Sequence, residues 1–408
     1  MTGASTLELA NVFVALLVAL ALIGLVSGRY AVPYTAALVV FGLLVSLLTP
    51  RSGVSITPEL ILAIFVPGLI FEAAFRMDTS LLRRNLAGVV LLALPGVLIV
   101  AGLVTLILHV ATGMSYSSAF LVGAMVSATD PVAVIATMRQ MRAPHGLANL
   151  IEAESLFNDG TGVVLFSVAL SGADLLGSGA ISFATTVIVS LAIGTAIGVV
   201  TTWVAARTED VNLELTLTLI AAYGSYLAAD ALHQSGIIAT LVAGIILGSY
   251  GRRRGLSARA RVAIDTVWGY LAFLLTALVF LLIGLAITPS ELIGAAWAIG
   301  WGVLAVLVGR AVVVYGLLGG IGRTGLGRRL GLELPRGWLH VVFWAGLRGA
   351  IAVALALSVP AAQEDRGLLE RVVFGIVIFT LLVQGGTADR LLRWSGVSEA
   401  EPESPVSA

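Results

Sequence analysis

The sequence predicts an all-α polytopic membrane protein with about thirteen transmembrane helices. Of its 408 residues, 59% are hydrophobic and only 11% are charged, and the mean hydropathy is +1.04. Apolar runs of roughly the 20 residues that a membrane-spanning helix needs recur along almost the whole chain. The arginines between these runs also alternate in density, as they do in short loops on the two sides of a membrane. A lipid bilayer is therefore the expected surrounding of this chain.

The predicted spans follow one another with short connections. They cover residues 8–27, 33–48, 57–76, 85–110, 116–139, 150–171, 180–206, 213–231, 236–249, 262–287, 291–318, 337–359 and 368–393. We treat residues 1–393 as a single membrane domain. The remaining segment, 394–408, is short, polar and acidic, and we expect it to be a disordered tail.

Arginine gives an independent test of this count, because every residue in the Lys+Arg total of 23 is an arginine. With thirteen spans, an outside N-terminus and a cytoplasmic C-terminus, most arginines fall on the cytoplasmic side, as the positive-inside rule requires. The exceptions are Arg51, Arg366 and Arg371 in outside segments, and Arg310 and Arg348 within spans. One span more or fewer would move several arginine clusters to the wrong side.

Composition also excludes several classes of protein. The formal net charge is +0, which gives no reason to expect a nucleic-acid partner, and there is no cysteine for disulfides or thiolate chemistry. The sequence lacks the GxxxxGK[ST] loop of ATP-driven pumps and the HExxH pattern of zinc enzymes, and its four histidines are scattered. We therefore expect neither an enzyme nor a protein with a resident cofactor.

Two aspartates lie where ionised groups are costly. Asp130 and Asp159 are each about nine residues from the cytoplasmic ends of the fifth and sixth spans, which is about 14 Å deep in a core about 30 Å thick. Arg348 is about 17 Å deep in the twelfth span by the same helical rise. A charge inside a membrane helix costs at least about 2.5–3.5 kcal/mol on insertion scales, so such residues indicate function. Three opposed charges are predicted to share one layer.

The residues beside the aspartates favour cation binding. Pro131 removes a backbone donor and crowds the carbonyl of Ser127, so the helix is expected to break next to Asp130. Helical spacing stacks Glu154 over Asn158 and Ser155 over Asp159, in two neighbouring rows of oxygen-bearing side chains. The residues themselves indicate Asp159, Asp130, Asn158 and Ser155 as candidate ligands, with Glu72 as an open case. Such oxygens suit a hard cation such as Na⁺ or Li⁺.

Alternative interpretations exist for each of these features. Residues 158–162 (NDGTG) would be read as a tight turn in a soluble protein, but a turn here would leave the sixth span too short. Glu154 and Arg348 are better explained as a structural ion pair than as direct ligands. Glu72 is either a site residue or a charge that reaches toward the membrane surface, and Arg310 has a structural or surface-reaching role.

The breaks also predict an internal symmetry. The break at 129–131 in the fifth span has a counterpart at 346–349 (GLRG) in the twelfth. The two breaks are seven spans apart. Because successive spans cross the membrane in alternating directions, the fifth and twelfth spans run in opposite directions. Paired, interrupted helices in inverted halves mark the binding site of many transporters. We therefore expect two inverted six-helix repeats joined by the seventh span, with broken helices 5 and 12 crossing.

Three motifs carry a resemblance to a known family. Residues 127–134 (SATDPVAV), 154–162 (ESLFNDGTG) and 346–351 (GLRGAI), in this order, resemble those of bacterial NhaP-type sodium/proton antiporters of the first monovalent cation/proton antiporter family. The resemblance extends from about the first span to Arg393. It implies a bacterial cytoplasmic (inner) membrane location, a homodimer, and exchange of Na⁺ or Li⁺ for H⁺.

The resemblance also implies roles for individual residues and segments. Asp159 would be the main cation and proton carrier, and Asp130 would lie at the crossing of the broken helices. Oxygen ligands would come from Thr129, Ser155 and Asn158, with Glu72 as a further candidate, and Glu154 would pair with Arg348. Asparagine at 158 resembles the electroneutral members. Helices 4–6 and 11–13 (about 85–171 and 291–393) would form a moving core, and helices 1–3 and 7–10 (about 8–76 and 180–287) a dimerising interface domain.

The predicted mechanism is competition between a proton and a cation for Asp159 and Asp130. The core would cross the membrane only when the site is neutralised, because an empty, charged site is too costly to move through an apolar barrier. The nearest alternative is a K⁺/H⁺ antiporter that uses the same residues, because the sequence does not indicate how large an ion the site accepts. A cation channel and an intramembrane protease are weaker alternatives.

Overall fold

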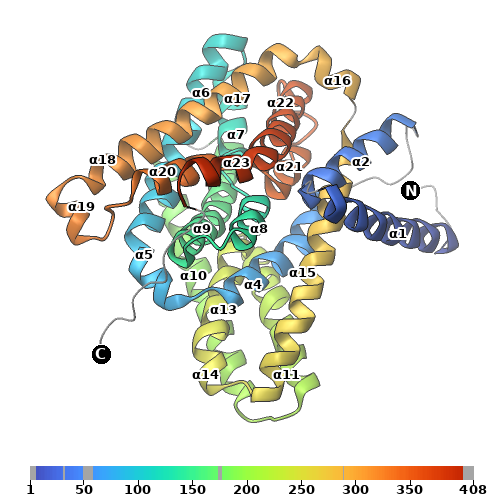
Figure 1. Cartoon of the computed structure of the whole chain (residues 1–408), viewed down its shortest axis with the longest axis vertical. Helices are drawn as coiled ribbons and strands as arrows, with labels where there is room; N and C mark the ends of the chain where they lie inside the picture. Colours follow the sequence, from blue (N-terminus) through green and yellow to red (C-terminus); the bar gives the residue numbers. More distant parts are fainter. Residues whose placement is uncertain (1–5, 31–32, 49–57, 173–176, 288, 398–408) are drawn as a thin grey trace.

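The computed structural model describes residues 6–30, 33–48, 58–172, 177–287 and 289–397, and in these ranges the regular structure is helical throughout (Figure 1). Several helices contain a π-helical turn, labelled η. The first part of the chain forms α1 (Thr6–Tyr30), α2 (Tyr34–Leu48), α3 (Pro58–Leu60), η1 (Ile61–Phe65), α4 (Val66–Arg76), α5 (Thr79–Leu91), η2 (Leu92–Gly96), α6 (Val97–Thr112), α7 (Tyr116–Met125), α8 (Val132–Gln140) and α9 (His145–Leu170).

The chain continues through a long helix and a second series of helical segments. These are α10 (Ser178–Ala205), α11 (Val211–Leu219), η3 (Ile220–Gly224), α12 (Ser225–Asp230), α13 (Gly236–Ile246), η4 (Leu247–Gly251), α14 (Arg252–Arg254), α15 (Ala258–Ala286), α16 (Pro289–Gly294), α17 (Ala296–Ala311), η5 (Val312–Leu318), α18 (Gly319–Gly322), α19 (Gly325–Arg329), α20 (Arg336–Trp344), α21 (Ala350–Leu357), α22 (Arg366–Phe379), η6 (Thr380–Gly385) and α23 (Gly386–Trp394). Of the expected tail, Trp394 ends α23, and residues 398–408 lie outside the described residues.

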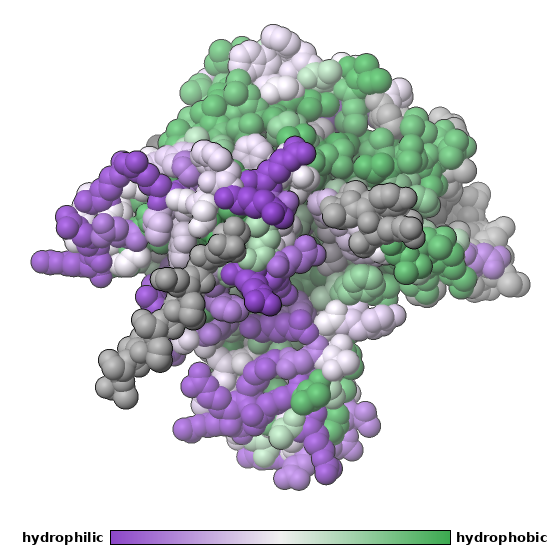
Figure 2. Space-filling model, viewed as in Figure 1, coloured by the Kyte–Doolittle hydropathy of each residue, from purple (hydrophilic) through white to green (hydrophobic). Residues whose placement is uncertain are grey.

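The outer surface has the character of a membrane protein. Six continuous helices in the described ranges are long and apolar enough to cross a bilayer: Pro58–Arg76, Thr79–Thr112, Ser178–Ala205, Ala258–Ala286, Ala296–Gly322 and Arg366–Trp394. Large hydrophobic side chains such as Ile181, Val110 and Leu98 are exposed. Figure 2 shows hydrophobic residues over the region of α6 and α17, and hydrophilic residues near α19, α23 and α14. The prediction of a polytopic, all-helical membrane protein is confirmed; the count of thirteen and the orientation of the termini stay predictions.

The helices pack as two groups that meet along α9. In one group α6 packs against α7 and α17, α5 packs against α9, and α17 packs against α22. In the other, α15 packs against α2 and α4, and α13 against α10 and α4. Gly42 and Gly284 bring α2 and α15 into backbone contact, since a Cβ atom on either would collide with the other helix. Contacts of α9 with α10 and α13 join the groups.

Two helices are interrupted in mid-course, as the sequence predicts. The helix that begins as α7 stops at Met125 and resumes as α8 at Val132, and the one that begins as α20 stops at Trp344 and resumes as α21 at Ala350. Elsewhere π-helical turns absorb irregularities without ending the helix, as at Pro95 in η2. The turns η2 and η5, which belong to the predicted fourth and eleventh spans, contact each other. The two breaks therefore differ in kind from the other irregularities, because there the chain leaves the helix altogether.

Candidate functional site

Asp130 lies at the point where the two interrupted helices meet. Its backbone N–H donates to the carbonyl of Leu347 at 2.9 Å, and its Oδ1 accepts from the N–H of Val132 at 3.1 Å, the first residue of α8. Gly349, directly before α21, is so close that a Cβ atom there would collide with the Asp130 carboxylate. The N-terminal ends of α8 and α21, which carry partial positive charge, therefore both face this carboxylate.

Asp159 reaches the same region from α9, which runs unbroken from His145 to Leu170. Residues 158–162 are helical, so the tight-turn interpretation of NDGTG is wrong. Gly162 packs directly on the broken segment, with Ser127 and Ala128 in contact with the position of its absent side chain. The close approach that this glycine permits brings Asp159 to the break, where it is near enough to Asp130 and Arg348 for their charges to interact.

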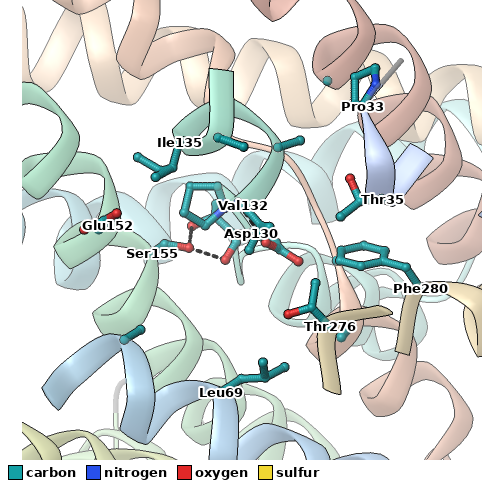
Figure 3. Close-up of a pocket in the computed structure, with 18 of the residues that line it drawn as sticks. Pro33, Thr35, Leu69, Asp130, Val132, Ile135, Glu152, Ser155, Thr276 and Phe280 are labelled. Carbon is teal, nitrogen blue, oxygen red and sulfur yellow. Dashed lines mark hydrogen bonds between the residues drawn. The ribbon is translucent and has the colours of Figure 1, made fainter. Parts of the chain in front are cut away.

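A short chain of hydroxyl and amide groups joins α9 to the break, and Figure 3 shows its Ser155 end with the hydrogen bonds as dashed lines. The Nδ2 of Asn158 donates to Thr129 Oγ1 at 3.2 Å, and Thr129 Oγ1 donates to Ser155 Oγ at 3.1 Å. Ser155 in turn donates to the carbonyl of Thr129. All three side chains are buried. The stacking predicted from helical spacing therefore holds Ser155 and Asn158 against the unwound backbone.

A cavity of about 840 Å³ opens beside these residues. Asp130, Asp159, Thr129 and Ser155 line it from one group of helices. Figure 3 shows Thr35, Thr276 and Phe280 facing Asp130 from the other group, so the cavity lies between the two groups. Carboxylate, hydroxyl and carbonyl oxygens at its inner end form a set suited to a small hard cation.

Two of the candidate ligands occupy different positions from the rest. Asn158 does not line this cavity; it lies behind Thr129 with its amide nitrogen directed at the hydroxyl. Glu72, on α4, lines the cavity and pairs with Arg76 at 2.9 Å, one helical turn along. Four of the six candidate ligands, Asp130, Asp159, Thr129 and Ser155, therefore line the cavity close together. Glu72 lies on the opposite wall and is paired with Arg76.

The buried ion pair differs from the predicted one. Glu154 pairs with Arg310, not with Arg348: Arg310 donates to both carboxylate oxygens, to Oε2 at 2.8 Å. Arg310 also donates to the carbonyl of Val342 at 2.7 Å, near the end of α20. Depth along the membrane normal does not report which helices are neighbours, so it did not reveal Arg310 as the partner. In the structure α17 packs against α6, and Arg310 on α17 reaches Glu154 on α9.

Arg348 has no carboxylate partner within hydrogen-bond distance in the described ranges. It is buried, 1% exposed, and its Nη1 donates to the carbonyls of Gly346 and Leu347, at 3.1 and 3.4 Å. These carbonyls are released where α20 ends, and a positive charge suits the C-terminal end of a helix. The positive charge of Arg348 is therefore left to interact with Asp159.

Sequence reasoning missed two residues that build the site. Arg310 was given a general structural or surface-reaching role, although it lies within the eleventh predicted span. Thr380, at the start of η6, accepts from the backbone N–H of Arg348 at 3.0 Å and holds the second break in place. A polar residue in the middle of an apolar span was the available signal for both.

The described part of the chain contains no group of three or more His, Asp or Glu residues arranged to hold a metal ion. His109 contacts the carbonyl of Met114 at 2.8 Å, and His340 contacts the hydroxyl of Tyr315 at 2.9 Å. Both histidines therefore have local structural partners outside the cavity.

Comparison with known proteins agrees with this geometry. Residues 13–394 match the family described as "Sodium/hydrogen exchanger, transmembrane". The chain belongs to this family. The NhaP-type antiporter ApNhaP of Aphanothece halophytica is 38% identical over 374 residues, covering 90% of this chain and 70% of the relative. The low-affinity antiporter NhaS1 of Synechocystis is 36% identical over 383 residues, covering 91% of this chain and 71% of the relative.

The fold of this sodium/hydrogen exchanger family member also matches a solved structure. The sodium proton antiporter MjNhaP1 of Methanocaldococcus jannaschii superposes with a TM-score of 0.75, covering 95% of this chain and all of that one, at 22% identity. The resemblance to NhaP-type antiporters that the three motifs carry is confirmed. The protein is a multi-pass membrane protein of an antiporter family.

Proposed function

We propose that this protein exchanges Na⁺ or Li⁺ for H⁺ by alternating access, one ion for one proton, with both competing for Asp159 and Asp130. The observation that carries the proposal is the pair of aspartates at the inner end of a cavity of about 840 Å³, at the crossing of two broken helices. Membership of the sodium/hydrogen exchanger family supports the same reaction, and the relatives named above support Na⁺ as the ion.

The charge balance of the site supports one-for-one exchange. Glu154 and Arg310 cancel each other in their ion pair. Arg348 contributes one positive charge, and Asp130 and Asp159 contribute two negative charges when both are ionised, so the empty, deprotonated site carries one net negative charge. Either one monovalent cation or one proton neutralises it. Since moving an uncompensated charge through an apolar barrier is costly, the loaded states cross and the empty state does not.

Four residues are proposed as the cation-binding set: Asp159, Asp130, Ser155 and Thr129. Asp159 and Asp130 supply carboxylate oxygens, while Ser155 and Thr129 supply hydroxyl or carbonyl oxygens at the cavity wall. Asn158 is proposed as a positioning residue, because its amide nitrogen holds the Thr129 hydroxyl. Glu72 is proposed as a further contact on the path, where Arg76 competes for its carboxylate.

The conformation is proposed to be open to the cytoplasm. Arg76, Arg139 and Arg393 line the cavity, and the positive-inside pattern assigns all three to the cytoplasmic side. Movement of the group containing α5–α9 and α17–α23 against the other group would close this side and open the opposite one. We also propose that the second group forms the contact of a homodimer in a bacterial cytoplasmic membrane.

Substitution of the carrier tests the exchange. Asp159→Asn removes the group that both ions need, so Na⁺-driven proton movement in proteoliposomes should fall to the level of protein-free vesicles. Asp230→Asn, which changes an exposed aspartate at the end of α12, is the matched control and should retain full activity. Full Na⁺/H⁺ exchange by Asp159→Asn would contradict the assignment. Na⁺, Li⁺ and K⁺ compared in the same assay determine the transported ion.

The positive charge of Arg348 gives a second, sharper test. Arg348→Gln makes the empty site doubly negative, so a cation must bind together with an extra proton to give a neutral site. Exchange should then decline with rising pH by up to about tenfold per pH unit, in a range where the wild type stays active. Arg348→Lys keeps the charge and should keep the wild-type pH profile. An unchanged profile in Arg348→Gln would refute the charge balance.

A further inference from the structure

A second, much smaller space lies behind the ion site, enclosed within the group of helices that holds both breaks. It has a volume of about 10 Å³. Ser127, Thr129 and Asn158 form one side, and Arg310 and Arg348 form another. Apolar side chains of α6 and η5, including Val97 and Val313, complete it. Only Thr129 and its neighbours separate this pocket from the large cavity.

Three residues that line this pocket each have a polar side-chain atom without a hydrogen-bond partner in the described part of the chain. These atoms are Oδ1 of Asn158, Nε of Arg310 and Nε of Arg348. The side chains are only 2%, 4% and 1% exposed, so bulk water does not reach them. An unsatisfied buried polar group costs about 1–3 kcal/mol, and more when the group is charged. Three such atoms around one small space indicate a shared ligand.

The orientation of the Asn158 amide follows from its neighbour. One end of the amide faces Oε1 of Glu154 at 3.0 Å. Both oxygens of that carboxylate act as acceptors, because Arg310 donates to each of them. The group that faces it must therefore be the donor, Nδ2, which leaves the acceptor Oδ1 for the pocket.

We propose that the pocket binds a single water molecule that is an integral part of the ion site. Its two lone pairs accept from Nε–H of Arg310 and Nε–H of Arg348, and one of its hydrogens is donated to Oδ1 of Asn158. A cavity needs about 10–15 Å³ to hold one water, and the polar partners of such a water number two to four. A halide ion does not fit, since it offers no hydrogen to Asn158 and exceeds the available volume.

Together with Glu154, the water fixes the direction of the hydrogen-bond chain that ends at the cavity. By holding Oδ1 of Asn158, it keeps Nδ2 directed at Thr129 Oγ1. Thr129 then donates to Ser155, and Ser155 donates to the Thr129 carbonyl. Both hydroxyl protons are thereby engaged within the protein, and the remaining lone pair of Ser155 is free to face a cation. The pocket water thus sets the polarity of two proposed ligands without contacting the ion.

An experimental density map of the whole protein at a resolution that shows ordered waters tests the first part directly, independently of transport activity. We expect one isolated peak within hydrogen-bond distance of Asn158 Oδ1 and both arginine Nε atoms. Absence of a peak, or an Asn158 amide turned to direct Nδ2 at the pocket, would overturn the proposal. A peak that gives an anomalous signal in bromide would assign the pocket to an anion and overturn it as well.

A space-filling substitution tests the second part. Val313→Ile adds a methylene to the pocket wall and should displace the water, whereas Val314→Ile adds the same group at an equally buried neighbour that does not line the pocket. We expect Val313→Ile to raise the apparent KM for Na⁺ by about threefold to tenfold and Val314→Ile to leave it unchanged. An unchanged KM in Val313→Ile, in protein whose map lacks the water peak, would refute the positioning role. If Val313→Ile does not fold, Val97→Ile, at another apolar wall of the same pocket, serves for the same comparison.

Discussion

The buried pair of Arg310 and Glu154 provides the most direct test of how the core is held together. Arg310→Gln removes a guanidinium that donates to both oxygens of Glu154 and to the carbonyl of Val342. Glu154 is 1% exposed and would keep only the amide of Asn158 as a donor. The substitution therefore leaves an uncompensated carboxylate within the membrane core.

The magnitude follows from this geometry. Breaking a buried ion pair by removing one partner costs about 3–5 kcal/mol. With an unfolding entropy of about 2.1 cal/mol/K per residue, this corresponds to a fall in Tm of about 4–6 °C for a chain of this length. Arg139→Gln is the matched control, because Arg139 and Glu152 form an ion pair of 2.9 Å on the exposed surface. Surface pairs contribute about 0–1 kcal/mol, so the control should lose about 1 °C or less.

The assay is thermal unfolding of purified protein in one detergent, extended to a double-mutant cycle. Arg310→Gln, Glu154→Gln and the double variant should give a coupling energy of about 1–3 kcal/mol, with the double variant recovering part of the lost stability. The equivalent cycle with Arg348→Gln should give a smaller coupling, since Arg348 donates only to backbone carbonyls. A larger coupling of Glu154 to Arg348 than to Arg310 would refute the pairing described above.

Two further predictions concern the crossing and the loop before α5. Gly349→Ala inserts a methyl group against the Asp130 carboxylate, so it should reduce exchange in proteoliposomes by tenfold or more, while Gly102→Ala, where a methyl meets open space outside the cavity, stays active. Asp78→Ala removes the cap of α5 and should cost about 1 kcal/mol. The Ser80 hydroxyl, together with backbone N–H groups, lowers the pKa of Asp78, so this contribution is present at neutral pH and is lost as the pH falls through that lowered pKa. The Tm difference from wild type should therefore shrink in acid; a difference that grows in acid would contradict the capping role.

Much of this protein could be predicted from its sequence, because a bilayer imposes a strong one-dimensional constraint. Hydropathy identifies helical segments, and the rise of a helix converts residue number into depth. Those two relations predicted the membrane class and the layer shared by Asp130, Asp159 and Arg348. Proline chemistry and the glycine pair around Arg348 predicted both helix breaks, since the local backbone chemistry is sufficient to end a helix.

Only the tertiary structure decided which groups at one depth face each other. The sequence paired Glu154 with Arg348, whereas the lateral packing of α17 brings Arg310 to Glu154 instead. The same lateral order turned Asn158 away from the cavity and brought Thr380 to the second break. A linear sequence specifies where each charge lies along the membrane normal. The choice of partner within the plane depends on how helices distant in the chain pack together, and that is decided by the fold as a whole.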